Sequence, residues 1–118
     1  MADLKNLEKR AFETLLGMGG GYVLDFSNRT FGEFVLDCTG MSIYEPRYGT
    51  SGGSKANLLR AFWKHEPNQT VGKLLAELIA YAQESNATLP EPLLLEACRR
   101  TAERLQADGL VVGCEAFV

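Results

Sequence analysis

The clearest structural signal in this chain is the stretch Val71-Gly72-Lys73-Leu74-Leu75-Ala76-Glu77-Leu78-Ile79-Ala80-Tyr81-Ala82. Its apolar residues recur every three or four positions, at Val71, Leu74, Leu75, Leu78, Ile79 and Ala82. This spacing places them along one side of an α-helix. The stretch therefore predicts a helix that buries one face in a core. Lys73 and Glu77 interrupt the apolar run and argue against a membrane span.

The segment before this stretch predicts a second helix, over residues 55–65, with Ser54 as its N-cap. The side chains expected to face inward are Leu58, Leu59, Phe62 and Trp63. Asn57, Arg60 and Lys64 are spaced i, i+3 and i+7, so they are expected to share the opposite, outward face.

Three further helices are predicted, from Asp3 to about Leu16, from a Thr30–Glu33 capping box to Gly40, and from Pro90 to Gln106 with Gly109 as its stop. The apolar stripe expected on the first of them is Leu4, Leu7, Ala11, Leu15 and Met18. Residues 41–48 are expected to be irregular, because Pro46 breaks regular structure.

Residues 22–26 are aromatic and branched and predict a short strand or an extended segment. As a strand it would pair with residues 110–112 or 116–118. The fold class is therefore mainly α: a compact five-helix domain with at most a small two-stranded sheet. A length of 118 residues predicts one domain, over residues 1–118. An ending on Phe117-Val118 is also compatible with a piece of a longer protein.

Charge is spread unevenly along the chain. The net charge is −3, yet the segment from Glu45 to Lys73 has five basic and two acidic side chains, a balance of +3, so the rest carries −6. We expect an anionic partner to choose the middle of the chain. The alternative is that these basic residues are ordinary solvated surface.

The three cysteines have no CxxC spacing, and an odd number argues against a closed disulfide framework. Cys38 and Cys98 are expected to be buried thiols, which suits a reducing cytoplasm. The N-terminus lacks the basic and apolar regions of a signal peptide. These observations predict a cytoplasmic protein without a membrane partner.

The glycine- and serine-rich segment Gly49–Ser54 leads into the helix that begins at Lys55. The first N–H groups of a helix lack partners and favour anions, and the basic residues nearby add to this preference. Arg29 belongs to a second polar cluster, residues 25–30, that is better explained by turns and caps than by binding. The predicted binding residues are Arg29, Arg47, Tyr48, Lys55, Asn57, Arg60 and Lys64.

Catalytic motifs are not matched. A phosphate-binding P-loop requires Gly-Lys-Ser/Thr, whereas this chain has Ser54-Lys55-Ala56. The single histidine, His65, and the scattered cysteines do not have the spacing of a zinc site or of a Cys–His nucleophile. We therefore expect a protein that is not an enzyme and that uses no metal or cofactor.

Four segments carry a resemblance to a known family: Gly21–Phe31, Ser42–Tyr44 with Tyr48, Gly53–Trp63 and Cys98–Leu105. They resemble an N-terminal module of bacterial abortive-infection, or phage-defence, proteins over roughly residues 12–105. In that family the module precedes a separate effector domain, and the resemblance carries no catalytic residue across. It implies a recognition or adaptor role.

Three hypotheses follow. The first is a non-catalytic recognition module of an anti-phage system that binds an anionic partner, most simply a protein, through the basic helix face. The second is a stand-alone inhibitor from a phage or mobile element, such as an anti-CRISPR protein, whose acidic remainder docks on a nucleic-acid-handling complex. The third is a DNA- or RNA-binding domain.

Overall fold

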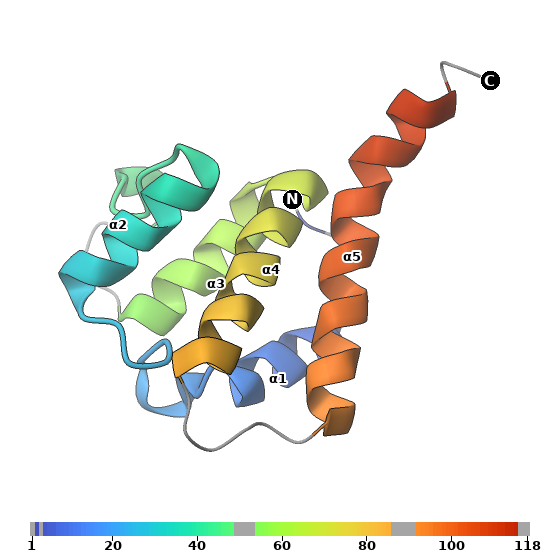
Figure 1. Ribbon diagram of the computed structural model, residues 1–118. Coiled ribbons are helices and arrows are strands. Elements are labelled where there is room, and N and C mark those ends of the chain that lie inside the picture. Colours follow the sequence, from blue (N-terminus) through green and yellow to red (C-terminus); the bar gives the residue numbers. More distant parts are fainter. Residues whose placement is uncertain (1, 3, 49–53, 86–91, 116–118) are drawn as a thin grey trace.

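The computed structural model describes residue 2 and residues 4–48, 54–85 and 92–115, with the backbone alone at residue 85 and residues 108–115. This part of the chain has no strand (Figure 1). Its five α-helices are α1 (Asn6–Leu15), α2 (Asn28–Thr39), α3 (Lys55–His65), α4 (Asn68–Ser85) and α5 (Pro92–Glu115). Two short 3₁₀ helices, η1 (Met18–Gly20) and η2 (Pro46–Tyr48), lie between them. The prediction of a mainly α, five-helix domain is confirmed.

Helix α4 lies centrally, with α2 on one side and α5 on the other, and α5 extends beyond the other helices (Figure 1). The predicted stripe from Val71 to Ala82 is buried in full, with no member more than 4% exposed. Gly72 allows the backbone of α5 to approach closely: an added Cβ would lie 2.8 Å from Leu105 Cβ and 2.9 Å from Gln106 N. Helices α4 and α5 therefore pack directly against each other at Gly72, with no room for a side chain there.

Helix α3 has the predicted bounds and the predicted cap, because Ser54 Oγ accepts a hydrogen bond of 3.2 Å from the N–H of Asn57. Its inward residues are all buried, as expected: Leu58, Leu59, Phe62 and Trp63. Trp63 packs against Phe12 of α1, with ring centres 6.3 Å apart.

The predicted strand at residues 22–26 is wrong. The N–H of Leu24 donates to the carbonyl of Leu16 at 2.8 Å, and Leu24 has a positive φ of 49°, so the segment turns back on the end of α1. Phe26 stacks on Tyr81 of α4, with ring centres 4.4 Å apart. Aromatic packing explains the composition that predicted a strand. Residues 110–112 lie in α5 and offer no strand partner, and residues 116–118 lie outside the described residues.

Three predicted helices also differ in their limits. α1 begins at Asn6, and α5 begins at Pro92 and continues past Gly109 to Glu115, since one glycine costs a helix only about 1 kcal/mol. α2 begins at Asn28 because Ser27, and not Thr30, is its N-cap: Ser27 Oγ accepts from the N–H of Thr30 at 3.1 Å. It ends before Gly40 as predicted.

The predicted stripe on α1 is wrong at Leu7, which is 78% exposed. Phe12 and Leu16, which the sequence analysis did not place in the core, are fully buried. Cys98 is buried as expected, whereas Cys38 is half-buried. The segment 41–48 is not entirely irregular, because it contains η2.

Candidate functional site

The start of α3 is less available to an anion than the sequence suggested. The N–H of Ala56 donates to the carbonyl of Gly21 at 3.1 Å, and the N–H of Asn57 is taken by the Ser54 cap. Lys55 Nζ donates to Asn28 Oδ1 at 3.2 Å and lies 5.0 Å from the ring centre of Tyr22. These contacts connect α3 to α2 and to the turn after η1. Residues 49–53 lie outside the described residues.

Two of the predicted arginines are paired with carboxylates. Arg29 Nε lies 3.3 Å from Glu33 Oε2, one turn further along α2. Arg47 lies 3.5 Å from both Glu45 and Glu66. Arg29 and Arg47 therefore already have carboxylate partners, on α2 and around η2.

Tyr48 is only 4% exposed, so the expectation that it is an exposed binding residue is wrong. Its hydroxyl donates to Glu66 Oε2 at 2.5 Å, and its ring packs on Phe62. Burial, with the adjacent Glu66 carboxylate, raises the pKa of the Tyr48 hydroxyl. Tyr48 is thus an anchor between η2 and α3, a role that its position in a polar segment did not reveal.

Arg60 lies between α1 and α3. Its Nε donates to Glu13 Oε2 at 2.7 Å, and its Nη1 donates to Asn57 Oδ1 at 2.8 Å. The side chains of Arg60 and Glu13 are 37% and 33% exposed, so the pair is only partly accessible. Lys64, one turn further along α3, is exposed as expected.

Two hollows adjoin this ion pair. One, of about 370 Å³, is lined by Ala2, Lys9, Glu13, Arg60, Trp63 and Lys64. The other, of about 410 Å³, is lined by Arg10, Glu13, Thr14, Gly17, Gly19 and Arg60. Because Glu13 and Arg60 line both hollows, we treat them as one basic groove, whose charged residues are Lys9, Arg10, Glu13, Arg60 and Lys64.

The basic groove has a large excess of positive charge. Of the described residues, four cations and one carboxylate line it, a formal charge of +3 in a chain whose net charge is −3, so the rest of the chain carries −6. Among the described residues, no carboxylate lies within ion-pair distance of Lys9, Arg10 or Lys64. The groove is therefore rich in donors and poor in acceptors.

Lys9 and Arg10 were missed by the sequence analysis. They are adjacent polar residues on a helix whose apolar side was the only signal considered. What makes them part of a site is the packing of α1 against α3, and no local pattern encodes that contact. Of the predicted binding residues, Arg60 and Lys64 line the groove, and Asn57 orients Arg60.

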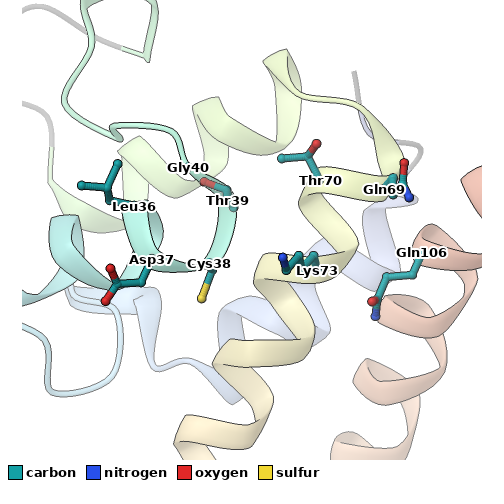
Figure 2. Close-up of a pocket in the computed structure, with 9 residues that line it drawn as sticks. All are labelled: Leu36, Asp37, Cys38, Thr39, Gly40, Gln69, Thr70, Lys73 and Gln106. Carbon is teal, nitrogen blue, oxygen red and sulfur yellow. The ribbon is translucent and has the colours of Figure 1, made fainter.

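A larger hollow lies elsewhere, between the end of α2, the start of α4 and Gln106 of α5 (Figure 2). Its volume is about 640 Å³, and Lys73 extends from α4 toward Cys38 of α2 (Figure 2). Asp37 also lines this cleft, so its charges are balanced. Burial, together with the nearby Glu77 and Asp37 carboxylates, raises the pKa of the Cys38 thiol to about 11 against the influence of Lys73. The thiol is therefore protonated at neutral pH and is a poor nucleophile.

The described residues do not form a metal-binding cluster. In the described ranges, no cluster of three or more histidine, cysteine, aspartate or glutamate side chains is placed to hold a metal ion. His65 is exposed at the end of α3, with its ring edge-on to Tyr48. No helix in the same ranges has both the length and the apolar composition that crossing a bilayer requires.

The chain matches no protein-family model, no curated protein sequence and no solved structure. The resemblance to abortive-infection proteins therefore stays a prediction from the sequence.

Proposed function

We propose that this chain is a non-catalytic recognition module that binds an acidic segment of a partner protein in the basic groove. The observation that carries the proposal is that, among the described residues, four cations surround one carboxylate in a chain that is otherwise acidic. Carboxylates bind arginine and lysine through charge-assisted hydrogen bonds, which are stronger than neutral ones. Lys9, Arg10 and Lys64 supply such donors without an ion-pair partner in the described residues.

A short acidic segment suits the surface better than a long nucleic acid does. The charge of −6 outside the groove repels a polyanion that extends beyond the two hollows. Each hollow has a volume of a few hundred Å³, which is enough for individual side chains. A protein partner also agrees with the adaptor role that the sequence resemblance implies.

The sequence resemblance supports a place for this module in a bacterial anti-phage system of the abortive-infection type. In this proposal the groove detects or recruits an acidic partner, and an effector outside this module acts on the cell. An inhibitor of the anti-CRISPR kind would instead use the acidic remainder. Charge reversal in the groove would then leave its activity intact.

The test compares the affinity of the wild type and of two charge-reversal variants, Lys9→Glu and Lys64→Glu, for a synthetic peptide of alternating glutamate and glycine. We expect each variant to bind at least about ten-fold more weakly, because it replaces attraction by like-charge repulsion. Arg100→Glu is the matched control, since it makes the same charge change at an exposed position of α5. Equal losses in Arg100→Glu and Lys64→Glu would overturn the assignment of the groove.

Arg60→Glu is not a clean test, because it would place a second carboxylate beside Glu13 and disturb the contact between α1 and α3. A nucleic-acid partner is examined with a single-stranded oligonucleotide in place of the peptide. Binding of the oligonucleotide alone, falling steeply between about 50 and about 200 mM salt, would replace the proposed protein partner.

The anti-phage role is tested in phage-infected bacteria. The tagged wild type and the tagged Arg100→Glu control should capture the same acidic protein, and Lys64→Glu should not. Capture of the same protein by all three would show that the partner does not use the groove.

A further inference from the structure

We propose that Glu13 is a built-in competitor for the partner's carboxylate and that it sets the affinity of the basic groove. This inference rests on the proposed function. Among the described residues, Glu13 is the single carboxylate that lines either hollow, and it lines both. It contacts Arg60, the one cation that the two hollows share.

The contacts of Arg60 leave a defined place for a second carboxylate. Glu13 Oε2 accepts from Nε at 2.7 Å, and Asn57 Oδ1 accepts from Nη1 at 2.8 Å. The remaining nitrogen, Nη2, has no acceptor among the described residues. Nε and Nη2 lie on the same edge of the guanidinium, where a carboxylate binds with both oxygens. Glu13 is bonded there through Nε alone, so this edge is only partly used.

Asn57 keeps the guanidinium in position when its carboxylate partner changes. The amide oxygen of Asn57 lies one turn before Arg60 on α3 and contacts the opposite side of the guanidinium from Glu13. An arriving carboxylate therefore meets a guanidinium that is already oriented. Binding is tighter when a side chain is already ordered in the free protein, because less conformational entropy is then lost on binding.

The Glu13–Arg60 pair is about one-third exposed, and ion pairs of this kind contribute little to stability. A partner can therefore displace Glu13 at small cost. The displaced carboxylate remains in the groove and repels the partner's negative charge. Removing the charge of Glu13 should thus strengthen binding, whereas a merely structural role for Glu13 predicts weaker or unchanged binding.

The first experiment measures the affinity of Glu13→Gln for the glutamate–glycine peptide, with Glu33→Gln as the matched control. Glu33 also pairs with an arginine at the surface, on α2, so both variants remove one negative charge and one ion pair. We expect Glu13→Gln to bind about five-fold more tightly and Glu33→Gln to bind within about two-fold of the wild type. Equal effects would show that only the total charge matters and would overturn the inference.

The second experiment repeats Glu13→Gln in an Arg60→Gln background. If the partner's carboxylate takes the place of Glu13 on Arg60, most of the gain should disappear when Arg60 is absent. A gain of unchanged size would contradict competition for Arg60. In the wild type, the side-chain Nε–H resonance of Arg60 should also shift when the peptide is added, and a fixed resonance would argue against the exchange.

These outcomes separate the inference from the proposed function. If the wild type binds the peptide, Lys64→Glu loses binding and Glu13→Gln gains none, the groove is the site and Glu13 is not a competitor. If neither the wild type nor Glu13→Gln binds, the proposed function fails, and the inference fails with it.

Discussion

The contact between α4 and α5 and the contact between α1 and α3 are built in opposite ways. The backbones of α4 and α5 run close together, and Gly72 leaves no space between α4 and Leu105. α1 and α3 meet through side chains, namely the Phe12–Trp63 ring contact and the Glu13–Arg60 ion pair, and both hollows of the basic groove adjoin that pair. A contact filled by packing serves stability, whereas one that retains space and excess charge is suited to binding.

The largest expected effect breaks the α4–α5 contact. Gly72→Val should destabilise the fold by about 3 kcal/mol, because the new side chain meets Leu105 Cβ, Gln106 N and the carbonyl of Ala102 within 3.0 Å. Backbone atoms cannot yield as a flexible side chain can. The measurement is the free energy of unfolding in urea, with circular dichroism as the signal.

Gly19→Ala is the control for this prediction, because a Cβ at Gly19 would have no neighbour within 4 Å. Its free energy of unfolding should change by less than about 0.5 kcal/mol. If Gly72→Val were as stable as the wild type, α4 and α5 would not pack as closely at Gly72 as the structure shows.

The second largest effect is a pH dependence of stability that comes from the contact between α1 and α5, where Glu8 forms an ion pair with Arg104. Burial acts to raise the pKa of Glu8, but hydrogen bonds from the N–H of Lys5 and from Arg104 outweigh it, so the pKa lies below its ordinary value of 4.5. A carboxylate whose pKa is lower in the folded than in the unfolded state stabilises the fold at pH values above its unfolded-state pKa. That contribution to stability is lost as the pH falls through the pKa that the carboxyl group has in the folded state.

Stability should therefore decrease as the pH falls from 4.5, and Glu8→Gln should remove part of this decrease. The expected size is about 1 kcal/mol, kept small because solvent screens a partly exposed pair. Urea unfolding of both proteins at a series of pH values checks the prediction. Identical pH profiles would mean that Glu8 is not stabilised by its contacts.

A smaller effect is expected from Arg60→Gln in the α1–α3 contact. Loss of the Glu13 ion pair should lower stability by only about 0.5 kcal/mol, because both partners are one-third or more exposed and solvent screens their attraction. Thermal unfolding monitored by circular dichroism measures the change. A loss as large as that of Gly72→Val would mean that the ion pair, and not ring packing, holds α1 to α3.

The smallest expected effect on stability is that of Lys64→Glu. The side chain is exposed and has no ion-pair partner in the described residues, so the free energy of unfolding should stay within about 0.5 kcal/mol of the wild type. Its loss of peptide binding would then report on recognition alone. If Lys64→Glu were clearly less stable than the wild type, Lys64 would instead contribute to the stability of the fold.

Local sequence patterns predicted the elements whose packing follows from their own periodicity. The bounds and buried residues of α3 and the buried stripe of α4 could be predicted because i, i+3 and i+4 spacing determines a face without knowledge of its partner. The same reasoning failed at Leu7, since the helix around it turns Phe12 inward instead. It also failed at residues 22–26, where Phe26 packs on Tyr81 of α4 and no strand forms.

The candidate site was predicted only in part for a related reason. Arg60 and Lys64 were recognisable as an outward pair on one helix. Lys9 and Arg10 join them through a contact between α1 and α3, which no local spacing reveals. Tyr48 was misassigned because its hydroxyl has a buried partner, Glu66, that is distant in the sequence.

The most direct test of the central claim is a nuclear magnetic resonance titration of the wild-type protein with the glutamate–glycine peptide, which reports on both hollows at once. The account predicts shifts of resonances at Lys9, Arg10, Arg60 and Lys64, with those of Lys73 and Gln106 in the α2–α4–α5 cleft unchanged. Shifts confined to that cleft, or no shifts at saturating peptide, would contradict the claim that the basic groove is where this protein binds its partner.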